Sequence, residues 1–269
     1  MSDWEDIGYE PEYASGPDEY DVSARETLRG FFEANDSNVF FVNQLVVQNE
    51  RTFFHWVTRN AIDYLIADGF LATEKRKLAT GTEIKLLWHN RYRYYKRNAA
   101  KVVKLVNEYG SPNMCASLGL WGEQMVLAAF AKRQFLLREQ HTRKYGDKEW
   151  TASNQNLDFV FERDGRAYGI EVKNTLSYMD ESELDAKIAL SEHLGITPVF
   201  AARMLPKSWI KRVIDHGGYA MILKYQLYPW THADLAKKVA AELSLPVDAP
   251  KALADGTMDR FLKWHQKKL

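Results

Sequence analysis

Two acids and a lysine in the second half of the chain are suited to act together on a phosphodiester: Asp158, Glu171 and Lys173. Two facing carboxylates repel each other unless a cation lies between them, and a hard divalent ion prefers oxygen ligands. A lysine beside them can orient or deprotonate a water molecule, and a bound ion lowers the pKa of that water and neutralises charge on a phosphate. These residue types therefore predict metal-dependent hydrolysis if the fold brings them together.

A predicted β-hairpin is the element that would do so. Residues 157–162 and 167–173 alternate between apolar and polar side chains, and Asp164-Gly165 lies between them, which is a strong signal for a two-residue turn. With this turn, Asp158 comes directly opposite Glu171, at about 5 Å between their Cβ atoms. Lys173, two residues further on, points to the same face.

The Glu-x-Lys motif alone is not specific, because Glu83-Ile84-Lys85 repeats it. An exposed structural hairpin with an ion-paired lysine is the alternative interpretation. The motif at Glu171 differs from the other in its context: an aspartate lies at the register-matched position, and a predicted helix carrying Glu123 precedes it.

With these residues the second half resembles the PD-(D/E)xK nuclease superfamily, which has the restriction-endonuclease-like fold. The resemblance covers residues 114 to about 229. It implies Asp158 and Glu171 as metal ligands, Lys173 as the base that orients the water, and Glu123 as an auxiliary catalytic acid near the metal. It also implies Mg²⁺ as the cofactor, with Mn²⁺ as a substitute.

Some neighbouring residues modify this picture. The family's proline before the aspartate is absent, since Leu157 stands there. Asn174 and Gln155 lie close enough in sequence to support the site, although a surface role is the simpler interpretation for each. His141 precedes the hairpin and could touch the substrate backbone, or lie in a solvated loop.

The remaining pattern of the second half predicts alternating helices and strands. Glu181 to Leu194 begins after Asp180, which resembles a helix cap. The predicted elements are helices 114–133, 180–194, 206–216, 231–244 and 255–268 and strands 198–204 and 219–227.

The first half predicts a winged helix-turn-helix domain, in which the third helix enters the major groove of DNA. Apolar residues at helical spacing predict helices, and alternating residues around Gly81 predict a hairpin. The predicted elements are helix 22–34, strand 39–41, helices 42–48 and 52–68, and strands 70–75 and 82–88.

The third helix and the basic segment after it supply candidate DNA contacts. Arg and Asn suit bidentate contacts to base edges, and basic residues interleaved with aromatics suit phosphates and stacked bases. The candidate DNA-binding residues are His55, Arg59, Asn60, Lys75, Arg76, Lys77, Lys85, Arg91, Arg93, Lys96 and Arg97.

Two alternatives remain open for this basic half. The charges could form one solvated helix face, and the domain could serve a protein interface. Phe53, Phe54 and Trp56 are a large apolar load for a segment that faces a groove, and packing against the second domain would explain them.

Composition excludes several classes of protein. The chain has 269 residues with 46% hydrophobic and 27% charged residues, which excludes a disordered or fibrous chain. Its single cysteine, Cys115, excludes disulfides within the chain and favours a cytoplasmic location. The sequence contains no run of about 18 consecutive apolar residues, so it predicts no membrane-spanning helix. Residues 1–21 carry eight acids and no Lys or Arg, and their composition predicts a disordered tail. This tail could compete with nucleic acid for the basic surface, or it could remain solvated.

The predicted fold is α/β (α+β), with a winged helix-turn-helix followed by a restriction-endonuclease-like αβββαβ core with a mixed sheet. The predicted divisions are an acidic tail 1–21, a winged-helix domain 22–90, a basic linker helix 91–113, a nuclease domain 114–229 and a helical extension 230–269.

The predicted function is that of a Mg²⁺-dependent endodeoxyribonuclease acting on double-stranded or branched DNA, because a groove-reading helix has little access to A-form RNA. One such site cuts one strand, so cutting both strands requires a homodimer or two binding events. Two alternatives remain open. One is a DNA-binding or recombination protein whose second domain is inactive, and the other is a subunit of a defence or transposition assembly that needs a protein partner.

Overall fold

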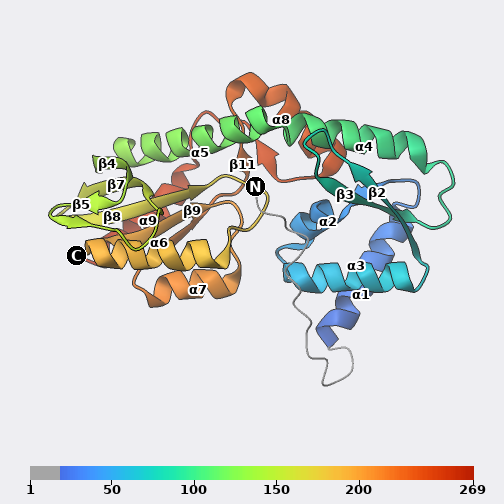
Figure 1. Cartoon of the computed structure of the whole chain (residues 1–269), viewed down its shortest axis with the longest axis horizontal. Helices are drawn as coiled ribbons and strands as arrows, with labels where there is room; N and C mark the ends of the chain where they lie inside the picture. The colour runs from blue at the N-terminus through green and yellow to red at the C-terminus, as the bar shows by residue number, and fades with distance from the viewer. Residues whose placement is uncertain (1–18) are drawn as a thin grey trace. The chain divides into compact units, whose positions relative to one another are not determined.

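The structure, a computed structural model, describes residues 19–269. Its described residues divide into two compact units (Figure 1). The first comprises residues up to Arg76 together with Ile84–Ala99, and the second comprises Lys77–Glu83 together with Ala100–Leu269. The acidic tail predicted over residues 1–21 lies, up to residue 18, outside the described residues.

The first unit has the helices and strands in the order that the sequence predicted. The elements are α1 (Glu19–Ala34), β1 (Phe40–Phe41), α2 (Val42–Asn49), α3 (His55–Ala67), β2 (Leu71–Lys77) and β3 (Glu83–His89), with strand order β1-β3-β2. Apolar residues of α1, α2 and α3 meet in one core around Leu28, Phe32, Leu45 and Ile62. Helix α3 begins three residues later than predicted, because Thr52 and Phe53 form a turn that donates both amides to the Asn49 carbonyl.

Two long helices follow. Helix α4 (Tyr95–Tyr109) begins after a turn in which Tyr92 N–H donates to the His89 carbonyl, so it is shorter than predicted. Helix α5 (Pro112–Lys132) begins at Ser111, whose hydroxyl accepts a hydrogen bond from Met114 N–H. Of the described helices, α5 is long and apolar enough to cross a membrane, a test that the core helix of a globular domain also passes.

A five-stranded mixed sheet is the centre of the second unit, as the predicted α+β class requires. Its order is β10-β9-β8-β7-β4. Strands β4 (Leu136–Thr142), β7 (Leu157–Arg163) and β8 (Arg166–Lys173) are antiparallel, and β9 (Thr197–Ala202) and β10 (Tyr219–Ile222) continue parallel to β8. The crossover between β8 and β9 is helix α6 (Glu181–Leu194), and α7 (Lys207–Asp215) connects β9 to β10.

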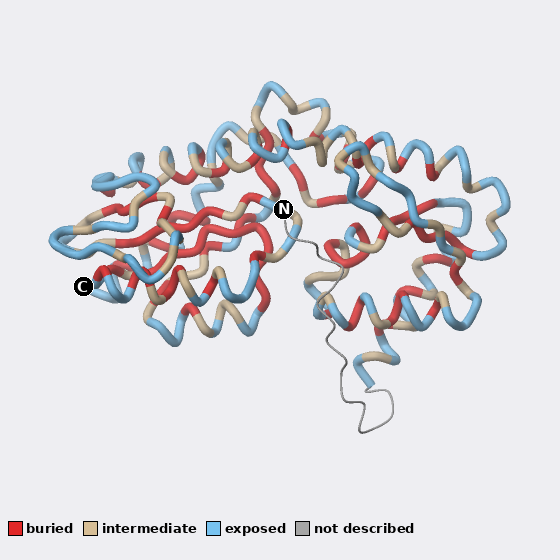
Figure 2. The backbone as a smooth tube through the Cα atoms, in the orientation of Figure 1, coloured by how far each residue is buried: buried red, intermediate tan, exposed pale blue. Residues whose placement is uncertain are grey.

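Helices cover both faces of this sheet. Phe130 of α5 and Phe261 of α9 (Asp255–Gln266) pack on one face, and Leu190 of α6 packs with Val160 on the other. Figure 1 shows α5 on one side of the strands and α6 and α7 on the other, and Figure 2 shows the buried backbone of the strands between them. The sheet is therefore buried between helices on both faces, and side chains at its edges reach the solvent.

The β7–β8 register is the one that the Asp-Gly turn predicted. Arg163 pairs with Arg166, and the ladder continues to Phe159 opposite Ile170. Asp164 and Gly165 both have left-handed backbones, at φ 52° and 71°, as a type I′ turn requires. The residues next beyond the ladder are Asp158 and Glu171.

Three segments differ from the predicted elements. Strand β4 and the short ribbon of β5 (Lys144–Tyr145) and β6 (Lys148–Glu149) were not predicted. The predicted strand 219–227 is interrupted: β10 ends at Ile222, and β11 (Gln226–Leu227) pairs instead with β12 (Val247–Asp248). Between them lie a 3-10 turn (Trp230–His232) and α8 (Ala233–Leu243).

Asn174 is a buried link at the end of β8, which corrects the expectation of a surface role. Its amide nitrogen donates to the carbonyls of Leu118 (2.8 Å) and Leu227 (2.7 Å), and its amide oxygen accepts from Leu227 N–H at 2.7 Å. Gly122 is required beside it, because a Cβ at that position would lie 2.6 Å from the Cβ of Asn174. One side chain thus ties β8, α5 and β11 together.

Replacing Asn174 with alanine should lower the free energy of unfolding by about 3 kcal/mol, because buried backbone groups lose their partners. Urea unfolding would measure this change, with Asn154→Ala, at an exposed loop position, as the matched control. A loss of less than about 1 kcal/mol would contradict the proposed role of this link.

Candidate metal centre

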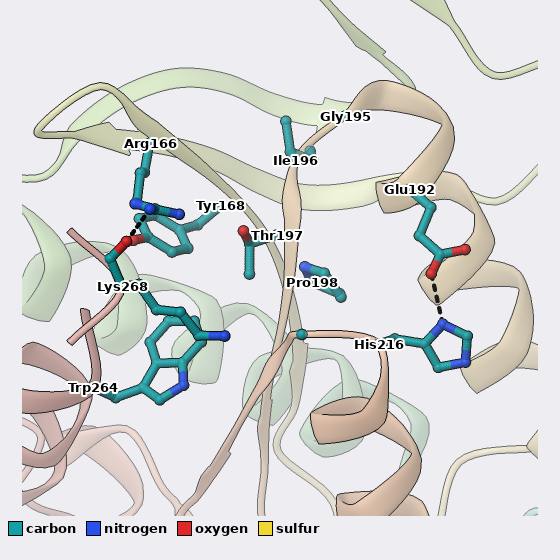
Figure 3. Close-up of a pocket in the computed structure, with 11 residues that line it drawn as sticks. Arg166, Tyr168, Glu192, Gly195, Ile196, Thr197, Pro198, His216, Trp264 and Lys268 are labelled. Carbon is teal, nitrogen blue, oxygen red and sulfur yellow. Dashed lines mark hydrogen bonds and ion pairs between the residues drawn. The ribbon is translucent and has the colours of Figure 1, made fainter. Parts of the chain in front are cut away.

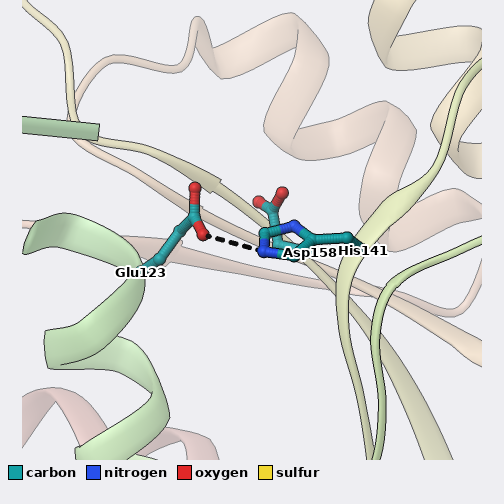
Figure 4. Close-up of side chains that lie close together, drawn as sticks. All are labelled: Glu123, His141 and Asp158. Carbon is teal, nitrogen blue, oxygen red and sulfur yellow. Dashed lines mark ion pairs between the residues drawn. The ribbon is translucent and has the colours of Figure 1, made fainter. Parts of the chain in front are cut away.

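Three side chains from separate elements converge at one edge of the sheet: Glu123 of α5, His141 of β4 and Asp158 of β7 (Figure 4). Each offers one donor atom, and these atoms all lie within 4.8 Å of one another. The imidazole Nε2 of His141 is 3.8 Å from a carboxylate oxygen of Glu123. Glu123 and Asp158 were predicted to lie near the metal. His141 was predicted either to touch the substrate backbone or to lie in a solvated loop, and it lies instead on strand β4.

The sheet register places two of these residues side by side. Strand β4 pairs with β7 so that Gln140 lies opposite Phe159 and Thr142 opposite Leu157, which puts His141 opposite Asp158. The backbone of His141 is left-handed, at φ 46°. Such a conformation is uncommon outside glycine and is found preferentially at functional sites.

Asp158 is fixed from the neighbouring strand. Its Oδ2 accepts a hydrogen bond of 2.7 Å from the backbone N–H of Val172, which lies on β8 between Glu171 and Lys173. Burial raises the pKa of Asp158 above its ordinary value, although this hydrogen bond acts in the opposite direction. Burial also raises the pKa of Glu123.

Glu171 was expected to be a metal ligand, but in the structure its carboxylate forms ion pairs with two lysines. Its carboxylate is 3% exposed, and its oxygens pair with Lys187 Nζ at 2.5 Å and with Lys173 Nζ at 3.3 Å. It is not one of the three grouped donors. Burial, followed by the negative charge of Asp158, raises the pKa of Glu171 to about 7, against the opposing effect of the two lysines.

Lys187 is a residue that the sequence prediction missed. It lies on α6, is 3% exposed, and donates to the carbonyl of Asn156 as well as to Glu171. Its spacing was a usable signal, because Lys187 falls on the same helical stripe as the buried residues Leu184, Ile188 and Ser191. A lysine is almost never fully buried unless it is paired, so a lysine on an apolar stripe indicates a buried acid nearby.

Lys173 is held as a cation. Its Nζ lies 2.7 Å from Glu183 of α6, in addition to its contact with Glu171. Burial acts to lower the pKa of Lys173, but the two carboxylates outweigh this and raise it. An ammonium group has no lone pair, so in this arrangement Lys173 can orient water or a phosphate oxygen but cannot accept a proton.

The donor set fits a divalent cation. Several acids with raised pKa values lie together, and a cation among them would remove their mutual repulsion. Glu123 and Asp158 supply hard oxygen donors, whereas the imidazole of His141 suits Mn²⁺ and later transition ions better than Mg²⁺. Glu171, already paired with two lysines, would need to rearrange before it could bind the ion.

Gln155 was expected near the site, but it lies in the loop before β7, where its backbone N–H donates to the hydroxyl of Ser153. Arg203, which was not predicted, is buried directly after β9, and its N–H donates to the carbonyl of Lys173. That hydrogen bond extends the pairing of β8 to Lys173, the last residue of the Glu-x-Lys motif.

The candidate DNA-binding residues lie on the first unit and at the tip of its hairpin. Arg59 of α3 is exposed and donates to Asn43 at 2.8 Å, while His55 and Asn60 are half-buried. Burial, then the charge of Arg59, lowers the pKa of His55.

The basic residues of the hairpin and of the segment after it are mostly exposed. Lys85 pairs with Asp63 at 3.2 Å, and Arg76 pairs with Glu74 at 2.8 Å. The exposed members of this basic set are Lys75, Arg76, Lys77, Arg91, Arg93, Lys96 and Arg97.

A cavity of about 270 Å³ lies elsewhere in the second unit (Figure 3). It is lined by residues at the starts of β8 and β9, such as Arg166 and Thr197, and by Trp264. Glu171 and Lys173 lie at the opposite end of β8. The cavity is therefore separate from the candidate metal centre.

Removal of the imidazole should weaken transition-metal binding selectively. We expect Mn²⁺ to raise the Tm of the protein, and His141→Ala to weaken the apparent Mn²⁺ affinity about 10-fold or more while changing Mg²⁺ affinity less. Metal titrations followed by thermal unfolding would measure this, with His232→Ala as the control. An unchanged Mn²⁺ midpoint in His141→Ala would exclude His141 as a ligand.

Comparisons with known proteins add little to this geometry. No protein-family model matches the chain, and no curated protein matches it. Among solved structures the chain is similar to Can2 from Sulfobacillus thermosulfidooxidans in complex with cyclic tetra-adenylate, with 12% identity and a TM-score of 0.30. The match covers 76% of this chain and 52% of that chain, so this chain spans about half the length of Can2. The chemistry of the site therefore follows from this chain's own residues.

Proposed function

We propose that this protein is a metal-dependent nuclease that hydrolyses phosphodiester bonds of DNA, with the first unit binding the nucleic acid. The observation that carries the proposal is the convergence of Glu123, His141 and Asp158 at the sheet edge where Glu171 and Lys173 end β8. Partly buried acids around one point, with the buried Glu171 and two lysines beside it, suit a site that binds a cation and a phosphate.

Each residue has a role that its contacts support. Glu123, His141 and Asp158 would hold the metal ion, which when bound supplies Lewis-acid stabilisation of charge on the phosphate. Lys173, kept protonated by Glu171 and Glu183, orients the attacking water or a phosphate oxygen through its N–H groups.

Glu171 and Lys187 have a supporting role in this proposal. Because Lys187 is buried against Glu171 at 2.5 Å, it limits the repulsion between Glu171 and Asp158. Removing one partner of such a pair leaves an uncompensated buried charge. The pair therefore ties the end of β8 to α6.

The first unit supports the nucleic-acid part of the proposal. Its helix order and hairpin match the winged-helix arrangement, and the exposed Arg93, Lys96 and Arg97 lie on the segment that follows β3. Exposed basic residues supply the sequence-independent part of DNA affinity by releasing counterions. Double-stranded or branched DNA is the proposed substrate, Mg²⁺ or Mn²⁺ the cofactor, and the cytoplasm the location.

Cleavage should require both the metal and the sheet-edge residues. We expect purified protein with Mg²⁺ or Mn²⁺ to cut DNA, EDTA to abolish cutting, and Asp158→Ala and Lys173→Ala each to lower the rate at least about 100-fold. Supercoiled, linear, single-stranded and branched DNA would be compared by gel electrophoresis, with Lys237→Ala on α8 as the control. Equal rates in wild type and both variants would indicate a contaminant and exclude this site. No cleavage together with tight binding would favour a partner-dependent subunit or a protein that only binds DNA.

Binding to duplex DNA should depend on salt through the basic residues. Replacing Arg93, Lys96 and Arg97 with alanine should reduce the slope of log K against log salt by about 2.7, at about 0.9 per lost phosphate contact. Fluorescence anisotropy in EDTA would measure the slope without cleavage. A slope that stays at the wild-type value would show that these residues do not contact phosphates.

A further inference from the structure

We propose that Phe54 and Trp56 form a stacking platform for an unpaired base, so that the first unit prefers single-stranded or forked DNA to blunt duplex. This inference rests on the proposed function and narrows its proposed substrate, double-stranded or branched DNA, to DNA with unpaired bases. The two rings stack on each other at 4.6 Å between centroids and 4° between planes, at the start of α3. They are nevertheless 37% and 47% exposed.

The exposure of this pair contrasts with that of its neighbour in sequence. Phe53 is buried in the core of the first unit, where it packs edge-on against Tyr20 at 5.6 Å. Phe53 is therefore part of the core, whereas Phe54 and Trp56 stack on each other outside it. His55 also packs edge-on against Trp56, at 5.0 Å, which further restricts the orientation of the indole ring. Preorganised rings lose little conformational entropy when a further ring stacks on them.

The charge around the pair favours a nucleic acid as its occupant. Residues 51–60 include Arg51, His55 and Arg59 and contain no acid. A base that stacked on Trp56 would bring its phosphate close to this segment. An aromatic protein partner would have the stacking but not the negative charge that this segment attracts.

The geometry also decides which form of nucleic acid fits. Bases inside a duplex stack on one another and present only their edges to the grooves, which hydrogen-bonding side chains read. An aromatic ring instead stacks on the face of a base, and the face of an internal base is accessible only in a single strand or at a fork. The pair at the start of α3 thus favours DNA with unpaired bases.

Binding in EDTA tests the platform separately from cleavage. Affinities would be measured by fluorescence anisotropy for a single strand, a fork and a blunt duplex, using the full chain. We expect Trp56→Ala to weaken binding to the single strand and fork about 10-fold and to leave the duplex unchanged, and Trp56→Phe to retain most of the affinity. Trp230→Ala is the matched control, because Trp230 is a 71% exposed tryptophan on the second unit. Circular dichroism and thermal unfolding would establish that each variant is folded.

A second readout follows the stack directly. An oligonucleotide that carries 2-aminopurine should lose fluorescence on binding the wild type and recover it with Trp56→Ala. The salt slope should stay unchanged in Trp56→Ala, because stacking releases no counterions, and should fall by about 1 in Arg59→Ala.

Three outcomes would overturn the platform. These are no loss of single-strand affinity in Trp56→Ala, an equal loss on all three DNAs, or a gain of affinity on all three. A gain would indicate that the exposed rings hinder nucleic-acid binding rather than provide it. If the protein cut no DNA but Trp56→Ala still weakened binding to the single strand and fork alone, the nuclease proposal would be rejected and the platform would stand.

Discussion

The register of the β7–β8 hairpin is the constraint on which the candidate site depends. Two left-handed residues, Asp164 and Gly165, fix the turn, and the ladder runs from them to Phe159 opposite Ile170. A slip by one residue would move every side chain to the other face. Asp158 would then lose the hydrogen bond from the backbone N–H of Val172. A local turn thus determines a geometry six residues away.

Buried charge is the second determinant of the site. Glu171 and Lys187 are each 3% exposed. Burial, followed by the negative charge of Asp158, raises the pKa of Glu171. Taking both charges out of water is costly, and their mutual attraction offsets only part of that cost. An arrangement of this kind is typical of a functional site rather than of a stabilising core, which is why the lysines and acids together support the proposal of cation and phosphate chemistry.

The sequence predicted the elements whose pattern is local. The Asp-Gly turn, the helix ends at Ala34 and Leu194 and the apolar stripes of α1 and α3 follow from spacing and turn chemistry. Strand β4 was missed because it is an edge strand whose residues are exposed except for Thr142, so no alternation marks it. The burial of Lys187 could have been predicted from its position on the apolar stripe of α6, but its pairing with Glu171 could not, because that acid lies on another element. The place of His141 opposite Asp158 depends on that same edge strand and could not be read from the chain alone.

We propose that Glu123, His141 and Asp158 bind one divalent ion. The most direct test is a crystal structure of the protein grown with Mn²⁺, with the anomalous signal of manganese used to locate the ion. We expect one strong peak within about 2 Å of a donor atom of each of the three residues. A peak at another cluster of acids, or no peak beside Asp158 at saturating Mn²⁺, would contradict it.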